Sequence, residues 1–123
     1  MIKLDIYTTK DIIIGFKIQN HALREREMIL AGEAYDMICN SVSVLSQSVL
    51  IGLDEVLKLN VPYEMMDGYI KLDLRELDEE ELQKAQVLLK TFELSIDSIL
   101  LSLEQSFGKN KADQYIYVKK EEV

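Results

Sequence analysis

The chain contains one cysteine, Cys39, and one histidine, His21. A thiol and an imidazole together can supply the nucleophile and the general base of a hydrolase. Asp36 stands where helical spacing begins, so we expect it to cap a helix whose first turn holds Cys39. Free backbone N–H groups in a first turn stabilise a thiolate and a developing oxyanion. These residues therefore point to a thiol-dependent hydrolase.

Each of the two residues also has a structural interpretation. A single cysteine on a half-apolar helix is often a small core residue, and a histidine at a strand end is often a surface residue. Their pairing favours chemistry, because the one segment Leu23 to Tyr35 joins the strand end after His21 to the helix start before Cys39. The charged run from Arg24 to Glu27 makes this segment either a solvated loop or a movable lid, and the alternative to the lid is a further turn of helix packed on the core.

Composition restricts the class of partner. Lysine and arginine number 14 against 22 acidic residues, a net charge of −8, so we expect neither nucleic acid nor membrane as a partner. A basic polypeptide is attracted by such a surface, although the charge can serve solubility alone. One histidine and one cysteine are too few for a zinc site, and the glycines form no phosphate loop, so we expect no metal and no cofactor. A lone thiol and the lack of a leader sequence predict a cytoplasmic protein.

Periodicity predicts a single domain over residues 1–123. Alternating apolar residues indicate two hairpins and a closing strand, and 3.6-residue spacing indicates a helix from Asp36 to Leu57 and another from Glu79 to Phe107. The strands are expected at residues 2–7, 12–19, 61–66, 69–74 and 114–118. The order β-β-α-β-β-α-β predicts an α+β fold in two layers, a mostly antiparallel sheet with two helices on one face.

Local signals mark several boundaries. Asp67-Gly68 suits a two-residue hairpin turn, and Asp78 with Glu81 forms a capping box. Residues 109–113 are expected to be a polar connector, and residues 119–123 a frayed tail. The first helix carries a second apolar stripe, Met37, Val44 and Ile51, which needs cover from the other helix or from a partner subunit.

Two segments resemble the bacterial ribosomal-processing cysteine protease family, Prp. The first is Asn20-His21-Ala22, where the family has Gly-His-Ala, and the second runs from Asp36 through Cys39 to Ser43. The resemblance extends to Leu53, and the segment between His21 and Cys39 is several residues longer than in the family.

The resemblance implies a cysteine endopeptidase in which Cys39 attacks a peptide carbonyl and His21 transfers protons. Asp36 and Ser43 match the family's other polar motif positions. It further implies a homodimer whose substrate is the N-terminal extension of large-subunit ribosomal protein twenty-seven. Two alternatives remain open: a non-catalytic dimeric module of the same fold that acts in ribosome assembly, and a thiol-dependent enzyme acting on small molecules.

Overall fold

The structure is a computed structural model that describes residues 1–19, 33–66 and 68–123, with the backbone alone for residues 33–37 and 39. Within these residues the chain forms one five-stranded sheet. Its strands are β1 (Ile2–Thr9), β2 (Ile12–Gln19), β3 (Tyr63–Met66), β4 (Tyr69–Asp73) and β5 (Ile116–Glu122). The helical elements are α2 (Glu33–Ile51), the π-helical turn η1 (Gly52–Val56), α3 (Glu79–Phe107) and α4 (Lys109–Tyr115).

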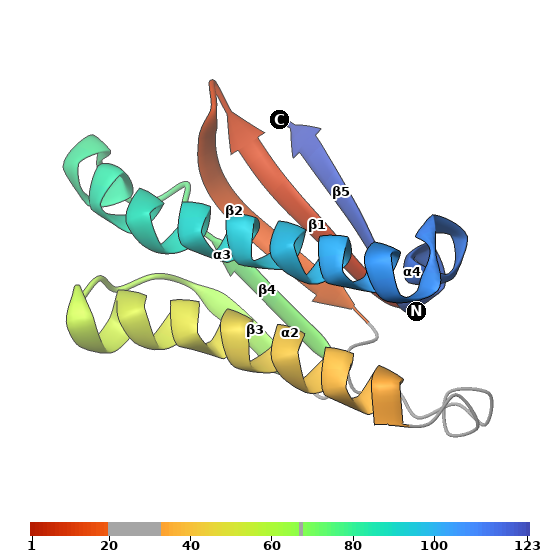
Figure 1. The fold of residues 1–123 in the computed structure, drawn as a ribbon. Helices are drawn as coiled ribbons and strands as arrows, with labels where there is room; N and C mark the ends of the chain where they lie inside the picture. The colour runs from red at the N-terminus through yellow and green to blue at the C-terminus, as the bar shows by residue number, and fades with distance from the viewer. Residues whose placement is uncertain (20–32, 67) are drawn as a thin grey trace.

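The sheet has the order β3-β4-β2-β1-β5 and is open at both edges. The pairs β1–β2, β2–β4 and β3–β4 are antiparallel, and β5 lies parallel to β1. The predicted α+β fold with a mostly antiparallel sheet is therefore confirmed. Figure 1 shows α2 and α3 side by side on one face of the sheet, running in opposite directions.

The core lies between the sheet and these two helices. In β1, Ile2, Leu4 and Ile6 are buried while Lys3 between them is exposed, so the alternation in the sequence corresponds to the two faces of the sheet. Phe16 of β2 stacks on Phe92 of α3 with 4.7 Å between ring centroids. The helices therefore bury the apolar face of each inner strand.

Two predicted boundaries are confirmed in detail. Met66 pairs with Tyr69, so a two-residue turn joins β3 to β4, and Gly68 has φ 75°; Asp67 lies outside the described residues. The Asp78 carboxylate accepts a hydrogen bond from the Glu81 backbone N–H at 2.8 Å, and Glu81 accepts one from the Asp78 N–H at 3.2 Å. This capping box starts α3.

Several predicted boundaries are wrong. The first strand extends to Thr9, and the strand predicted from residue 61 begins at Tyr63. The first helix begins at Glu33 rather than Asp36, and its last turn from Gly52 is a π-helix. Residues 109–113 belong to a helix, α4, in place of a polar connector, because burial of Ala112 and Tyr115 against the core stabilises a seven-residue segment too short to show a period.

The last strand starts at Ile116 rather than Gln114, and residues 119–122 pair with β1 instead of fraying. The side chains of this segment are polar, so the sequence shows no alternation that would predict a strand. The strand is held by its pairing with the backbone of β1.

Within the described part of the chain, no helix is both long and apolar enough to cross a membrane.

Candidate active site

Cys39 lies in the second turn of α2. The helix begins at Glu33, so Cys39 is its seventh residue, and Asp36 lies inside the helix rather than at its cap. The prediction that Asp36 caps this helix is therefore wrong. The unpaired N–H groups of a helix belong to its first four residues, and the field of the helix dipole falls off within the first turn. A thiol at this position therefore gains little from the helix N-terminus, and its activation would need a neighbouring group such as an imidazole.

Asp36, Cys39 and Ser43 occupy successive turns on one face of α2, because they are spaced by three and four residues. The hydroxyl of Ser43 is half-buried and accepts a hydrogen bond from Gln47 Nε2 at 2.8 Å. The buried hydroxyl of Ser46 donates to the carbonyl oxygens of Val42 and Ser43, each at 2.9 Å. These hydrogen bonds hold the polar side chains of α2 in the two turns after Cys39.

His21 lies two residues beyond the end of β2, outside the described residues. Gln19, the last residue of β2, pairs with Lys3 of β1 and Tyr69 of β4. The end of β2 and the first turns of α2 lie on the same side of the molecule (Figure 1). The prediction that the segment from Leu23 to Tyr35 is one loop is wrong at its end, because residues 33–35 are helical. Residues 23–32, and with them the predicted lid, lie outside the described residues.

A groove follows the same flank of α2 and separates that helix from the edge strand β3. Its volume is about 190 Å³. Gln47 and Leu50 line the helix side, Tyr63 and Met65 the strand side, and Ile51, Asp54 and Glu55 its far end. Because β3 is an edge strand, the backbone groups on its outer side have no strand partner among the residues that the structure describes. A peptide in extended conformation can add to such an edge by backbone hydrogen bonds.

This groove is absent from the features that the sequence predicts. The alternation at Tyr63 and Met65 is typical of a strand with one buried face, yet every residue of β3 is exposed. Pairing of β3 with β4 alone leaves both its faces and its outer edge open. Exposed apolar side chains on a short edge strand are the signal that indicates a binding surface.

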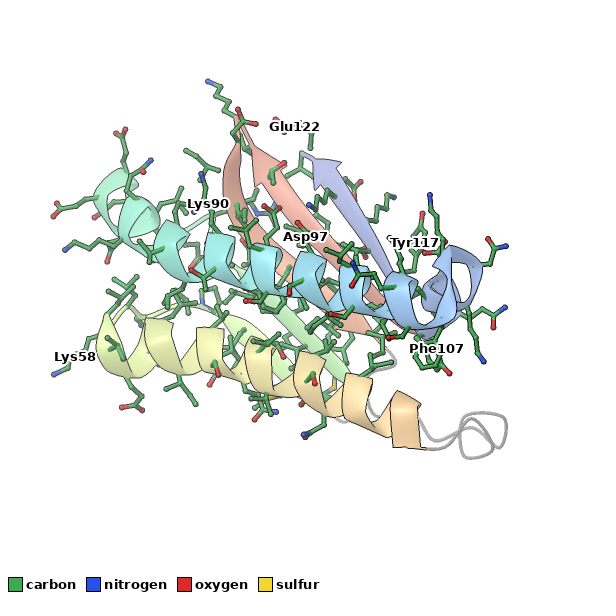
Figure 2. The ribbon with its side chains drawn as sticks, viewed as in Figure 1. Lys58, Lys90, Asp97, Phe107, Tyr117 and Glu122 are labelled. Atoms are coloured by element: carbon green, nitrogen blue, oxygen red, sulfur yellow. The ribbon has the colours of Figure 1, made fainter. Side chains whose placement is uncertain are left out.

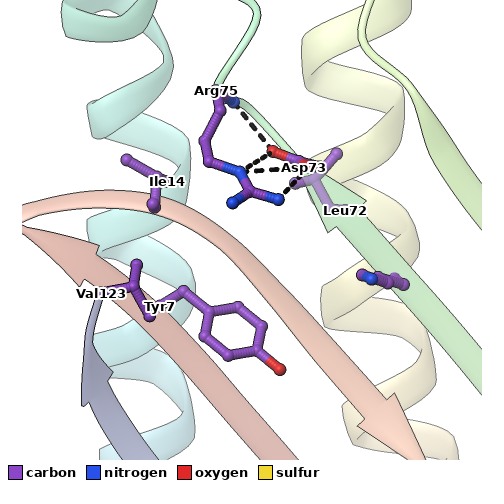
Figure 3. A pocket seen from close by; sticks show the side chains of 7 residues that line it. Tyr7, Ile14, Leu72, Asp73, Arg75 and Val123 are labelled. Carbon is purple, nitrogen blue, oxygen red and sulfur yellow. Dashed lines mark hydrogen bonds and ion pairs between the residues drawn. The ribbon is translucent and has the colours of Figure 1, made fainter.

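A second cavity lies at the other end of the sheet (Figure 3). It has a volume of about 140 Å³, and Tyr7, Asp73 and Arg75 are among its lining residues. The Arg75 guanidinium donates hydrogen bonds to both carboxylate oxygens of Asp73, and they hold the pKa of that carboxyl below its ordinary value although burial opposes this. Asp73 pairs with Gly15, whereas Tyr69 pairs with Gln19. The cavity is therefore separated from the end of β2 by the length of β4.

Among the described residues, no group of three or more histidine, cysteine, aspartate or glutamate side chains is arranged to hold a metal ion.

Several solved structures share this fold. A crystal structure of a Streptococcus mutans protein matches with a TM-score of 0.74 and 22% identity, over 100% of this chain and 99% of that one. The ribosomal processing protease Prp of Staphylococcus aureus, in complex with a substrate peptide, matches with a TM-score of 0.73 and 14% identity over 98% of this chain and 100% of that one. The same protease with a covalently linked product peptide matches with a TM-score of 0.68 and 15% identity, again over 98% and 100%. Among curated proteins, none matches the sequence.

The family model described as cysteine protease Prp matches residues 1–110, a segment that contains both His21 and Cys39. This match covers all of the sheet except β5. The chain belongs to the cysteine protease Prp family.

Proposed function

We propose that this protein, as one domain over residues 1–123, is a cysteine endopeptidase with Cys39 as nucleophile and His21 as general base and acid. The observation that carries the proposal is the family match across residues 1–110, within which His21 and Cys39 are the only histidine and the only cysteine. Asp36 and Ser43 lie on the same helical face as Cys39 and act as positioning residues.

The proposed reaction has two steps. The Cys39 thiolate attacks the scissile carbonyl carbon, and protonated His21 gives its proton to the amine that leaves. Neutral His21 then takes a proton from water, and the hydroxide oxygen attacks the thioester carbon. The tetrahedral intermediate that forms collapses by breaking its C–S bond and releases the new carboxylic acid, which loses its proton to solvent to become the carboxylate. The Cys39 thiolate and protonated His21 are thereby restored.

The proposed substrate is the N-terminal extension of large-subunit ribosomal protein twenty-seven. The Staphylococcus aureus relative is a ribosomal processing protease, and ribosomal proteins are basic polypeptides. A net charge of −8 attracts a basic chain and steers its approach. A free thiol and a ribosomal substrate both suit the reducing cytoplasm, where we place the protein. No cofactor takes part in these steps.

The test is to mix the protein with the extended form of its own organism's ribosomal protein twenty-seven and to map any cut by mass spectrometry. We expect one cut, at the junction of the extension. Binding without any cut would favour the alternative, a non-catalytic module in ribosome assembly. Turnover of small thioesters but no peptide would favour a small-molecule enzyme.

We further propose that the groove between α2 and β3 holds the extended peptide. The groove lies on the α2 flank that carries Cys39, and its far end holds the carboxylates of Asp54 and Glu55. Carboxylates there attract basic side chains of the bound peptide. The groove therefore adds sequence preference to the general charge attraction.

Reversal of these two charges, Asp54→Lys with Glu55→Lys, is expected to lower kcat/KM for a basic peptide about tenfold at low ionic strength. The loss should shrink as salt is added, because salt screens exposed charges. The matched control is Glu79→Lys with Glu80→Lys, which changes the net charge equally at the exposed start of α3. Equal losses in both variants would mean that the groove does not select the substrate.

We also propose a homodimer that buries the second apolar stripe of the first helix. Val44 is 53% exposed and Ile51 is 57% exposed, so α3 does not cover them. The side chain of Met37, the third predicted member, lies outside the described residues. Light scattering at micromolar concentration is expected to give the mass of two chains; a mass of one chain contradicts the dimer.

A further inference from the structure

The face of the sheet away from α2 and α3 carries the polar residues of the strands. The register of β1, β2 and β4 places Tyr7, Gly15 and Asp73 in one row across this face. Lys71 lies two residues before Asp73 and therefore points to the same side. Together with Arg75, which follows β4, the side chains of Tyr7, Lys71 and Asp73 line the cavity of about 140 Å³ in Figure 3.

The hollow of this cavity lies where the row has a glycine. Gly15 stands between Tyr7 and Asp73 and contributes no side chain. A Cβ atom at Gly15 would overlap the carbonyl oxygen of Leu72, so a larger residue there would force β2 and β4 apart. Neighbouring strands lie about 4.8 Å apart, so β1 and β4 are about 10 Å apart at this row. The hollow is therefore set by the backbone of the sheet.

The end of β5 forms one wall of the cavity. The N–H of Val123 donates to the Thr8 carbonyl at 2.9 Å, and its side chain lines the cavity beside Ile14. The carboxylate of Glu122, beside the β1–β2 turn in Figure 2, accepts hydrogen bonds from the Thr8 hydroxyl at 3.1 Å and the Lys10 N–H at 3.0 Å. Apolar groups on a fixed wall reduce the local dielectric and strengthen the attraction between a bound charge and its partners.

Three groups of the cavity can donate hydrogen bonds and have no acceptor among the described residues. They are Lys71 Nζ, the Tyr7 hydroxyl and Arg75 Nη1. Asp73 occupies the side of the guanidinium formed by Nε and Nη2, so its outer end, formed by Nη1 and the second hydrogen of Nη2, stays open. Lys71 and Tyr7 are half-buried. Donors that are partly shielded from water are suited to a ligand with several acceptor oxygens.

The charge around these donors is positive, although the whole chain has a net charge of −8. Arg75 is paired with Asp73, and Lys17 is paired with Asp5 at 3.8 Å in the neighbouring row. Lys71 lies directly opposite Lys17 and has no ion pair among the described residues. Like charges directly opposite one another destabilise a sheet. An anion beside Lys71 would remove this repulsion.

Two carboxylates of the outer strands limit the size of that anion. Glu64 of β3 pairs with Lys71 on the side away from β2, and Glu121 of β5 pairs with Tyr7 on the side away from β2. Neither glutamate lines the cavity. They repel an extended polyanion that crosses the sheet, so the site suits one anionic group placed between β1 and β4.

We propose that this cavity binds a phosphate group, with Lys71 Nζ, the Tyr7 hydroxyl and the open end of the Arg75 guanidinium donating to its oxygens. These donors come from β4, from β1 and from the segment after β4. A tetrahedral phosphate accepts hydrogen bonds from several sides, whereas a carboxylate accepts them in one plane. The cavity is smaller than the pockets of about 300–1,000 Å³ that enclose whole ligands. It therefore takes the phosphate group alone, and the proposal is independent of the proposed chemistry at Cys39.

Titration with sodium phosphate, followed by amide NMR shifts at fixed pH and ionic strength, tests the site. We expect saturable shifts that cluster around Gly15, Asp73 and Val123. Lys71→Gln should raise the Kd for phosphate about tenfold, because a charged hydrogen bond is lost. The matched control, Lys119→Gln, removes the same charge at an exposed position of β5 outside the cavity and should bind phosphate like the parent protein. Circular dichroism verifies that each variant folds.

Tyr7→Phe separates a built site from general charge attraction, since it removes a hydroxyl and no charge. The Kd for phosphate should rise about threefold. The proposal is overturned if the parent protein shows no saturable shifts. It is also overturned if Lys71→Gln and Lys119→Gln weaken binding equally, because phosphate would then respond only to net charge.

Two further ligands identify the anion and its source. Acetate should bind more weakly than phosphate, and equal binding would overturn the assignment to a phosphate group. Adenosine monophosphate that binds like inorganic phosphate would identify the free ion as the ligand, whereas tighter binding would identify a phosphate ester; the site stands in both cases. Peptide cleavage is measured separately, so a protein without protease activity leaves this test intact.

Discussion

Replacement of Cys39 by alanine is expected to abolish cleavage of the extended ribosomal protein. Alanine has no nucleophile, so neither the thioester nor its hydrolysis can occur. His21→Ala should lower kcat by about 10³-fold or more, since the thiolate would form less readily and the leaving amine would have no proton donor. The measurement is single-turnover cleavage of a fluorogenic peptide that spans the junction.

Two comparisons make this result specific. Because the two residues act as one unit, the double variant should be hardly slower than the slower single variant, and additive losses would indicate separate roles. Ser98→Ala, an exposed serine on α3, is the control for a small polar change on a helix and should keep full activity. Retained proteolysis in Cys39→Ala would rule out Cys39 as the nucleophile.

The position of Cys39 in the second turn of α2 adds a test of how the thiol is activated. With the helix N-terminus more than one turn away, we expect the imidazole of His21 to be the group that favours the thiolate of Cys39. More thiolate near neutral pH means faster alkylation, so His21→Ala should slow the reaction of Cys39 with iodoacetamide at pH 7. Equal alkylation rates in the parent protein and the variant would assign the activation to another group.

Local patterns predicted the fold well where neighbouring residues decide the structure. Ile2, Leu4 and Ile6 alternate with polar residues because one face of β1 is buried, and Asp78 with Glu81 satisfies the backbone of the turn that follows. Both signals act within a few residues. The order of strands and helices could therefore be read before any tertiary contact was known.

The errors lie where distant residues decide. Lys119 to Glu122 are polar, yet they form a strand because β1 offers an unpaired edge to them. The same holds for the groove between α2 and β3, since Gln47 and Tyr63 face each other only after β3 has paired with β4 at the edge of the sheet. The sequence predicts Cys39 and His21 as a chemical pair, whereas the groove between α2 and β3 depends on strand order.

Gln86 makes another contact between residues that are far apart in the sequence. Glutamine is mostly an exposed residue in proteins, but Gln86 is 6% exposed and its side chain reaches the backbone of β2. Gln86 Oε1 accepts a hydrogen bond from the Ile13 N–H, and Gln86 Nε2 donates to the Ile13 carbonyl, both at 2.8 Å. The pairing of β4 with β2 runs only from Gln19 to Gly15, so Ile13 has no strand partner on that side. The glutamine amide takes the place of the missing strand.

Gln86→Leu is therefore expected to lower the free energy of unfolding by about 2–4 kcal/mol. Leucine fills the space but leaves a buried N–H and a buried carbonyl without partners, and each such group costs about 1–3 kcal/mol. The measurement is urea unfolding at one protein concentration, so that dimerisation contributes equally to each variant. Gln83→Leu, one turn earlier on the exposed side of α3, is the matched control and should change the free energy by less than about 0.5 kcal/mol. Similar values for the two variants would mean that water replaces the amide at Ile13, and that α3 is held on the sheet by apolar contacts alone.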